Sequence, residues 1–416
     1  MKKTFSPPAP EKRAALLETQ RQLKMARSAH AYVRGNTLQF YDWLQTPAAT
    51  TVPAGPSIWI CGDCHVGNIG PVASSDGKVE LEIRDLDQTV IGNPAHDLIR
   101  LGLSLATAAR GSDLPGVTTA RMIEQMIDGY RDALNHRALN GATGKDGTKG
   151  KDGVKGKQVA APIEEVLHAA LRRRWKHLAE ERIEDVEPKI PIGRRFWPLS
   201  KSEAAEIRAL FATEPARNLV TCLKERQDDA KVEVVDAAYW KKGCSSLGRL
   251  RYAVLLRVGK QKGKDGTYCL VDIKEAVPAA APRAKDSKVF KDHALRVVEG
   301  ATHLSPYLGK RMLAAELSGR SVVIRELLPQ DLKLEMETLK MEDAMQASRH
   351  LAFVVGRAHA RQMTVKQKRQ WDGVLNRSKP KTLEAPSWLW KSVLELMARH
   401  EAAYLEHCRC YALKAQ

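Results

Sequence analysis

Apolar residues recur at helical spacing along much of the chain. Between residues 10 and 33, Leu16, Leu17 and Leu23 lie among charged residues, a pattern that predicts an amphipathic helix. Residues 97–109 are far more apolar, and we expect a helix there at the centre of a helical lobe. The same spacing predicts further helices over residues 36–46, 160–183, 201–229, 293–303, 347–362 and 386–406.

Short runs of apolar and β-branched residues predict strands. Residues 57–61 are bounded by proline and glycine and indicate a buried strand, whereas residues 79–83 alternate apolar and acidic positions and indicate a half-buried one. After residue 232 the pattern changes to a series of strand-like runs that glycine-containing turns separate. They lie at residues 232–235, 253–258, 268–274 and 321–326, and they predict an antiparallel meander.

These elements together predict an α+β fold with two lobes, for which 416 residues are enough. We expect a mostly helical part over residues 1–231, a small antiparallel-sheet part over residues 232–335, and a helical segment over residues 336–416 that completes the first part. Residues 141–157 carry glycine at every third position, with lysine and aspartate between and no proline. That composition indicates a solvated insertion, because a single chain cannot form a collagen triple helix.

The chain is strongly basic, with a formal net charge of +18 at pH 7. This balance favours anionic partners, which include nucleic acid, phosphorylated small molecules, acidic proteins and anionic membrane surfaces. Aromatic residues make up only 6% of the chain, so there is no evident stacking platform for single strands. Nucleic acid is therefore a disfavoured partner, although the charge alone does not rule it out.

Sequence signals of membrane insertion or export are missing. No apolar run approaches the roughly 20 residues of a transmembrane helix, and Met1-Lys2-Lys3 is not followed by the apolar core of a signal peptide. The seven cysteines are scattered, which indicates reduced thiols. The sequence therefore predicts a soluble, cytoplasmic protein.

The densest group of polar residues follows the two early strands. Asp63, His65 and Asn68 come after the first strand, and Asp85 and Asp87 come after the second. Their oxygens are the hard ligands that Mg²⁺ accepts beside phosphate oxygens. In phosphoryl transfer one aspartate orients and deprotonates the acceptor hydroxyl, while an asparagine and a further aspartate hold the metal. We therefore expect Asp63 to be the catalytic base and His65 to shape the loop or neutralise charge. The metal ligands would be Asn68, Asp85 and Asp87.

The alternative is a turn-rich loop whose aspartate and asparagine side chains cap backbone groups. The continuation favours the catalytic interpretation. Asp85 is followed by Gly92-Asn93-Pro94 and then by Asp97, which opens the most apolar helix.

These residues resemble a known catalytic block. The pattern is Gly62-Asp63-x-His65-x-Gly67-Asn68, then Asp85, then Gly92-x-Pro94-x-x-Asp97-Leu98. It is similar to that of the aminoglycoside phosphotransferase branch of the protein-kinase-like superfamily. The resemblance implies that Asp63 is the catalytic base and that Asn68 and Asp85 are Mg²⁺ ligands. It also implies a structural role for Asp97 at the start of the helix.

Over most of its length the chain more closely resembles an uncharacterised bacterial family known only as a domain of unknown function. That family also has Arg34-Gly35 upstream and a Lys-Glu-Ala strand later, here Lys274-Glu275-Ala276. Arg34 is either a phosphate-binding residue, through its forked guanidinium, or a partner in a surface salt bridge.

The order of the parts departs from that of kinases, in which the nucleotide lobe precedes the catalytic loop. Here that lobe would lie downstream, which implies a circularly permuted kinase-like fold that binds ATP. Lys274 ends a strand, as the phosphate-binding lysine of kinases does, and Glu299 on the next helix could pair with it. Residues 324–327 would form a hinge-like strand. A glycine-rich loop before the strand at residues 253–258 could approach the phosphates through Gly243, Ser245, Ser246 and Gly248.

The predicted function is an ATP- and Mg²⁺-dependent phosphotransferase that acts on a hydroxyl-bearing small molecule or protein. Two alternatives stay open: transfer of a nucleotidyl group, and a nucleotide-binding regulatory or scaffold protein without turnover that recruits an anionic partner. Zinc is disfavoured. Cys61-x-x-Cys64-His65 and His407-Cys408-x-Cys410 offer ligand types, but neither has the spacing of a zinc knuckle.

Overall fold

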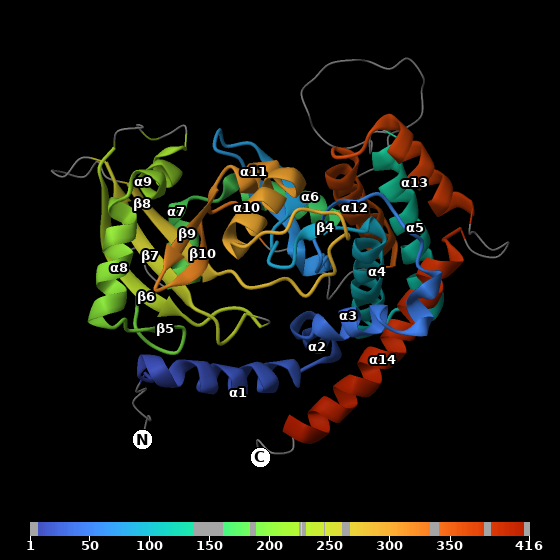
Figure 1. Cartoon of the computed structure of the whole chain (residues 1–416), viewed down its shortest axis with the longest axis horizontal. Coiled ribbons are helices and arrows are strands. Elements are labelled where there is room, and N and C mark those ends of the chain that lie inside the picture. The colour runs from blue at the N-terminus through green and yellow to red at the C-terminus, as the bar shows by residue number, and fades with distance from the viewer. Residues whose placement is uncertain are drawn as a thin grey trace.

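The computed structural model describes residues 7–135, 161–183, 189–223, 226, 230–244, 246–259, 267–332, 341–377 and 384–411. The fold is mixed α+β, with a sheet part and a helical part side by side (Figure 1). Ser245 and the glycine-rich insertion at residues 141–157 lie outside the described residues. Within the described residues, no helix is both long and apolar enough to cross a membrane.

An antiparallel sheet of six strands, in the order β5-β6-β7-β8-β10-β9, forms the first part. Alternate residues of its central strands face two different cores, so Val254 packs with one set of helices and Leu255 with another. The strands expected from the sequence are confirmed. β5 and β9 were not expected, since β5 has two residues and β9 contains alanines, which are poor strand formers. The strands are β5 (Phe196–Trp197), β6 (Val232–Trp240), β7 (Arg251–Val258), β8 (Thr267–Glu275), β9 (Met312–Leu317) and β10 (Arg320–Leu327).

Long helices form the second part, and α4 lies at its centre with most of its residues buried, as expected. α5 and α12 approach closely because glycines line their contact. A Cβ on Gly356 would lie 2.7 Å from the carbonyl oxygen of Tyr130, and one on Gly129 would overlap the carbonyl oxygen of Arg349. The helices of this part are α3 (Leu38–Leu44), α4 (Pro94–Gly111), α5 (Gly116–Leu134), α12 (Met341–Ala360), α13 (Val365–Arg377) and α14 (Ser387–Tyr411).

Two small two-stranded antiparallel sheets lie where the two parts meet. β1 (Ile58–Ile60) pairs with β4 (Val90–Gly92), and β2 (Ile69–Ala73) pairs with β3 (Val79–Ile83). This pairing places the segment that joins β1 to β2 beside the segment that joins β3 to β4. The Arg84 backbone N–H donates to the Asn68 carbonyl oxygen at 2.7 Å. The two polar segments noted in the sequence are therefore neighbours.

Two helical segments run from one part to the other. The first, called the strap here, is residues 13–35 and comprises α1 (Arg13–Met25) and α2 (Ala29–Gly35). A single helix over residues 10–33 was expected, but the strap breaks before Ser28, which caps α2. Leu17 packs into the core of the sheet, whereas α2 contacts α4 and α14.

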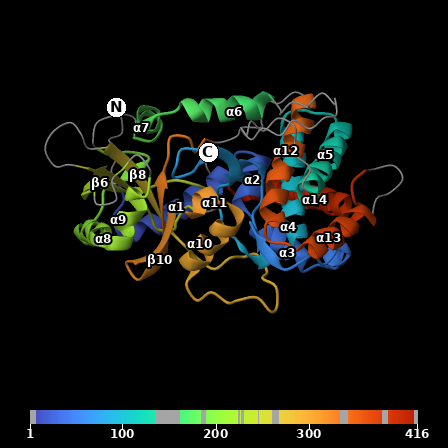
Figure 2. The same ribbon diagram turned by 90° about the horizontal axis from the view of Figure 1, so that it is seen from above.

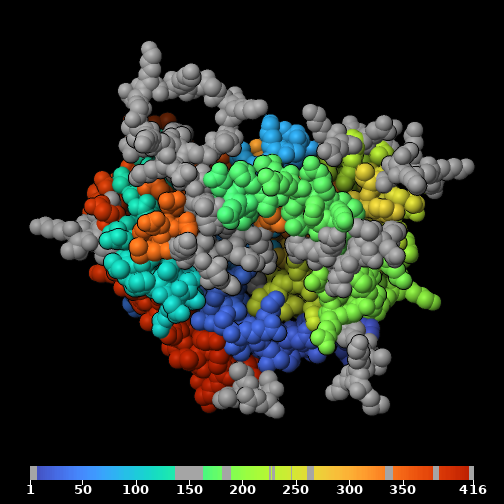
Figure 3. Space-filling view, turned by 180° about the vertical axis from the view of Figure 1, so that it is seen from behind, coloured from blue at the N-terminus to red at the C-terminus, as the bar shows by residue number. Residues whose placement is uncertain are grey.

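The second connection is α6 (Ala161–Arg172) with α7 (Trp175–Ile183), which runs along the upper edge of the view in Figure 2 and above the strap in Figure 3. Ile163 of α6 packs into the core of the helical part, and Leu178 of α7 packs against the sheet. The expected helix over residues 201–229 is divided at Thr213, two residues before Pro215, and the second helix ends at Thr221. The remaining elements are η1 (Pro10–Lys12), η2 (Pro47–Thr51), η3 (Val66–Asn68), α8 (Lys201–Ala212), α9 (Glu214–Thr221), α10 (His293–Leu304) and α11 (Pro306–Gly309).

Candidate functional site

The loop that leaves β1 is held by a buried carboxylate. Asp97, in the first turn of α4, accepts the backbone N–H groups of Cys61 at 2.7 Å and Gly62 at 2.9 Å. The same carboxylate lies 3.1 Å from Nε2 of His359, whose Nδ1 is 2.9 Å from the Tyr130 hydroxyl. Asp97 and His359 are fully buried. Buried polar groups that are all partnered hold one geometry, so this chain fixes where the loop begins.

Asp63 follows in that loop with both carboxylate oxygens engaged. Thr37 donates its hydroxyl to Oδ2 at 2.8 Å, and the buried Arg100 of α4 forms an ion pair with Oδ1. Burial alone would raise the pKa of Asp63, but the charge and hydrogen bond of Arg100, with help from Thr37, hold the pKa below its usual value. Asp63 is therefore an oriented carboxylate at neutral pH. Asn68 donates its amide to the Asp63 carbonyl oxygen at 2.8 Å, which closes the loop.

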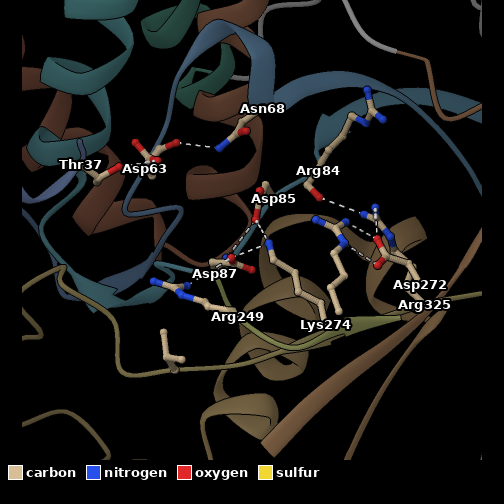
Figure 4. Close-up of polar contacts among 12 residues, drawn as sticks. Thr37, Asp63, Asn68, Arg84, Asp85, Asp87, Arg249, Asp272, Lys274 and Arg325 are labelled. Carbon is tan, nitrogen blue, oxygen red and sulfur yellow. Dashed lines mark hydrogen bonds and ion pairs between the residues drawn. The ribbon is translucent and has the colours of Figure 1, made fainter. Parts of the chain in front are cut away.

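Asp85 and Asp87 both contact one lysine, which comes from the six-stranded sheet and lies far from them in the sequence. Nζ of Lys274 lies 3.4 Å from Oδ1 of Asp85 and 2.5 Å from Oδ2 of Asp87 (Figure 4). Arg249 lies 4.0 Å from Asp87 on the other side. The structure thus brings Lys274 to Asp85 across 189 positions of sequence.

These contacts shift the pKa values of Asp85 and Asp87 in opposite directions. Partial exclusion from water would raise the pKa of Asp85, but the Lys274 charge outweighs it, and the pKa lies well below its usual range. The same exclusion, followed by the charge of Asp85, raises the pKa of Asp87. Asp85 is thus the more firmly ionised of the two and the better candidate to face a metal ion.

Strand geometry explains the placement of Lys274. Residues two apart on a strand point to the same face, so Asp272 and Lys274 project together from β8. The antiparallel register sets Arg251 opposite Lys274 and Arg325 opposite Asp272. Nε of Arg251 donates to Asp272 at 2.8 Å, and this buried ion pair lowers the pKa of Asp272 against the effect of desolvation. One face of the sheet therefore presents a charged patch to the two loops.

The loop between β6 and β7 covers this patch. Gly243 and Gly248 both adopt φ of +93°, a left-handed conformation that favours glycine. A Cβ on Gly243 would also overlap the hydroxyl of Ser246, which is buried. From the strap, Nζ of Lys24 donates to the Gly243 carbonyl oxygen at 2.7 Å. Gly243 and Ser246 line the cleft described below, and Gly248 does not.

The structure does not bring Glu299 to Lys274, which corrects that expectation. Glu299 is 3.4 Å from Nζ of Lys288 at the surface. The reason is helical phase, since Val297 lines the cleft and a residue two positions on lies about 200° around a helix. Arg296 of α10 does reach the loop that carries Asp85 and Asp87, where it donates to the Asp87 carbonyl oxygen at 2.9 Å.

His65 and Arg34 lie beside the Asp63 loop. Burial lowers the pKa of His65 to about 3, although Asp63 opposes this, so the imidazole is neutral at pH 7. That result favours a role in shaping the loop over the neutralisation of charge. No described residue forms a hydrogen bond with its buried Nδ1. The guanidinium of Arg34 lies against Gly67, where a Cβ would meet it at 3.2 Å.

All of these loops open onto one cleft of about 510 Å³. Most of the residues expected from the sequence line it, and Glu299 does not. Eight lysine and arginine side chains but only four aspartates contribute, which makes the cleft basic. The charged lining residues are Lys24, Arg34, Arg84, Lys241, Lys242, Arg251, Lys274, Arg325, Asp63, Asp85, Asp87 and Asp272.

A family model described as an uncharacterized protein conserved in bacteria, DUF2252, matches residues 13–410. The chain belongs to this family. No curated protein and no solved structure matches the chain. The match runs from α1 to α14 and so includes every part of the cleft. It confirms the resemblance to an uncharacterised bacterial family, whereas the kinase-like resemblance stays a prediction.

The oxygen donors of this DUF2252 chain suit some metal ions and not others. Among the described residues, no three His, Cys, Asp or Glu side chains gather as a ready metal site. Asn68 uses its amide nitrogen on the Asp63 carbonyl, so its amide oxygen stays available, and the Asp85 side chain is 47% exposed. Two protein oxygens suit Mg²⁺ that takes its other ligands from water and phosphate. They do not suit a structural zinc, which needs four protein ligands.

Several site residues of the DUF2252 chain were missed in the sequence. Arg100 and Asp272 are the clearest, because each is a single charged residue within a strongly apolar run, and such a residue is seldom buried without a partner. That signal was available. Thr37 and Lys24 carry no such signal, since they lie among other polar residues of amphipathic segments.

Proposed function

We propose that this chain is an ATP- and Mg²⁺-dependent phosphotransferase whose reaction takes place in the basic cleft. The contact that carries the proposal is that of Lys274 with Asp85 and Asp87, at 3.4 and 2.5 Å. A cation from a sheet and a carboxylate from a loop beside Asp63 are what a nucleotide with bound metal requires. Before nucleotide binds, the lysine and the carboxylates neutralise each other, which allows these charges to lie close together.

The order of elements supports a permuted kinase-like arrangement. The Asp63 loop and the Asp85 loop come first in the chain, and the glycine loop of residues 243–248, Lys274 on β8 and the β9–β10 hairpin follow. The proposed nucleotide lies between this glycine loop and Lys274, so backbone amides and the lysine share its phosphates. The last residues of β10 then serve as the hinge between the sheet and α12.

The proposed chemistry rests on positioning and charge. Asp63 orients the acceptor hydroxyl and takes its proton, while Thr37 and Arg100 keep the carboxylate in one orientation. Asn68 and Asp85 would hold Mg²⁺, which would supply neutralisation of charge on the phosphates. Lys274 leaves its carboxylate partners to contact the phosphates of the nucleotide.

A test follows from the role of Asp63. With γ-labelled ATP, Mg²⁺ and a panel of acceptors, Asp63→Asn is expected to lower label transfer by about 10²-fold or more, as is usual for loss of a general base. Asp113→Asn is the matched control, because Asp113 is exposed and its left-handed backbone suits asparagine. Equal transfer by Asp63→Asn and the wild-type protein would refute the role of Asp63.

One observation favours a second candidate, a nucleotide-binding regulator without turnover. Both oxygens of Asp63 already have partners, and its pKa is lowered, which weakens it as a base. Under this candidate the protein binds ATP with Mg²⁺, and no acceptor gives transfer that depends on Asp63. Nucleotidyl transfer is separated in the same assay by the use of α-labelled ATP.

A further inference from the structure

Three basic side chains form a cluster on the Asp63 side of the cleft. Lys24 and Arg34 come from the strap, and Lys241 directly follows β6, ahead of the glycine loop. All three line the cleft. Arg34 lies against Gly67, within the same loop as Asp63. We call Lys24, Arg34 and Lys241 the basic cluster.

The basic cluster differs in its partners from Arg251 and Lys274, the cations of the cleft that come from the sheet strands β7 and β8. Arg251 and Lys274 are paired with carboxylates, as described above. The described residues provide no such carboxylate for the cluster. Nζ of Lys24 donates to a backbone carbonyl, and Nζ of Lys241 lies over the Trp197 ring at 5.8 Å.

The members of the cluster also repel one another. Burial lowers the pKa of Lys24, and after an opposing effect from Cys244 the charges of Arg27 and Arg34 lower it further. Burial likewise lowers the pKa of Lys241, and the charges of Arg194 and Lys24 add to this. Like charges gathered without a counter-charge are unfavourable, unless an anion binds among them.

His65 gives independent evidence of a ligand. Its side chain lines the cleft beside Arg34, the residue is 5% exposed, and Nδ1 has no hydrogen-bond partner among the described residues. A buried polar atom without a partner is costly, so a polar ligand group is expected there.

We propose that the acceptor is a small hydroxyl compound that carries a phosphate or carboxylate group, and that the basic cluster holds this group while His65 hydrogen-bonds the compound. This inference rests on the proposed phosphotransfer and specifies its substrate class. It places the anionic end of the acceptor at the strap and its hydroxyl at Asp63.

The surroundings of the cluster disfavour other occupants. A polyamine or an aminoglycoside would meet repulsion from three cations. The strap forms the wall of the cleft here, and Lys24 ties it to Gly243, so a protein segment would have to displace this contact. The nucleotide triphosphate is assigned to Lys274 and the glycine loop, and whether it also uses the cluster is an outcome of the test.

The test is calorimetric titration with glycerol 3-phosphate, lactate, glycerol and an aminoglycoside, with and without a non-hydrolysable ATP analogue and Mg²⁺. Glycerol 3-phosphate and lactate distinguish the phosphate from the carboxylate form of the ligand. Arg34→Gln and Lys241→Gln each remove one charge of the cluster. Lys201→Gln is the control, since Lys201 is exposed at the start of α8 and does not line the cleft.

At least one of the two anions is expected to bind more tightly than glycerol, and the aminoglycoside is expected not to bind. Each cluster variant should weaken anion binding about tenfold, as loss of a charged hydrogen bond does, while nucleotide binding changes less than about twofold. Anion binding no tighter than that of glycerol, or cluster variants that weaken only the nucleotide, would overturn the proposal. If the ATP analogue does not bind at all, the proposed phosphotransfer is refuted. The anion site is still tested in that case, because anion binding is also measured without the ATP analogue.

Discussion

At the scale of single residues, the site depends on buried charged side chains, each of which has an ionic or hydrogen-bond partner. Asp97, Arg100 and Asp272 lie almost completely out of water, and each has its counterpart within hydrogen-bond reach. A buried ion that loses its partner is costly, whereas an exposed one is not. Substitutions at these positions should therefore alter both stability and the geometry of the loops.

Asp97→Ala removes the acceptor of two backbone N–H groups and of the His359 imidazole. We expect the free energy of unfolding to fall by about 3 kcal/mol or more, the usual cost of breaking a buried charged network. Urea unfolding measures this, with Asp113→Ala as an exposed control. A loss below about 1 kcal/mol would mean that Asp97 does not anchor the loop.

Arg100→Gln removes the cation beside Asp63. Since that cation holds the Asp63 pKa down against burial, its loss raises the pKa, and the carboxyl becomes protonated at higher pH. The acidic limb of the pH–rate profile for phosphotransfer should move upward, and Arg100→Lys should restore part of the shift. An unchanged limb in Arg100→Gln would show that Asp63 is not the group that titrates.

At the scale of elements, close contacts decide which residues a position tolerates. α5 and α12 touch at Gly129, where a Cβ would overlap the carbonyl oxygen of Arg349. In the sheet, strand register decides which charged residues meet. The pairing of β7 with β8 sets Lys274 beside Arg251. The register of β8 thus fixes which charged side chains of the sheet lie together in the cleft.

Gly129→Ala should destabilise the protein by about 1–3 kcal/mol, because the two helices must separate to admit the methyl group. Gly373→Ala on α13 is the matched control, since the nearest neighbour of its Cβ is the end of Arg377 at 3.7 Å. In Gly373→Ala the higher helix propensity of alanine should increase the free energy of unfolding by up to about 1 kcal/mol. Thermal unfolding of the two variants should change in opposite directions, and a stabilised Gly129→Ala would contradict the close packing.

Glu82 of β3 makes the contact between its hairpin and α11 depend on pH. Its buried carboxyl accepts the backbone N–H groups of Tyr307 and Leu308, yet burial raises its pKa from 4.5 to about 7. The folded protein therefore holds this proton more tightly than the unfolded chain does. The stabilisation of the folded protein that results from this higher pKa of Glu82 is complete below about pH 4.5. It is lost as the pH rises through about 7.

Glu82→Gln should remove this part of the pH dependence, which amounts to at most roughly 3 kcal/mol. Relative to the wild-type protein, the variant should gain stability at pH 8 compared with pH 5. The measurement is urea unfolding at both values. A difference between variant and wild type that is equal at pH 5 and pH 8 would show that Glu82 does not titrate in this range.

At the scale of the whole molecule, the sequence predicted the local elements well and the distant contacts only in part. The strands of the sheet, the apolar α4 and the loops with Asp63 and Asp85 follow from periodicity and spacing. The meeting of Lys274 with Asp85 was predicted from a resemblance, because spacing cannot show which distant segments touch. Glu299 was assigned to Lys274 by order along the chain, and helical phase directs it elsewhere.

The strap is the feature that local patterns could not place. Its apolar face predicts a helix but does not show that one end packs on the sheet and the other on α4. Together with α6 and α7 it holds the sheet and the helical part around the cleft. The basic cluster exists only because of this arrangement, since two of its members belong to the strap.

The central claim is that Lys274 and Asp85 together hold a nucleotide with Mg²⁺. The most direct test is calorimetric titration of ATP into the wild-type protein, Lys274→Ala and Asp85→Ala, with and without Mg²⁺. The prediction is Mg²⁺-dependent binding by the wild-type protein that weakens at least about tenfold in each variant, as expected for loss of a charged contact. ATP binding that stays intact in both folded variants would contradict it.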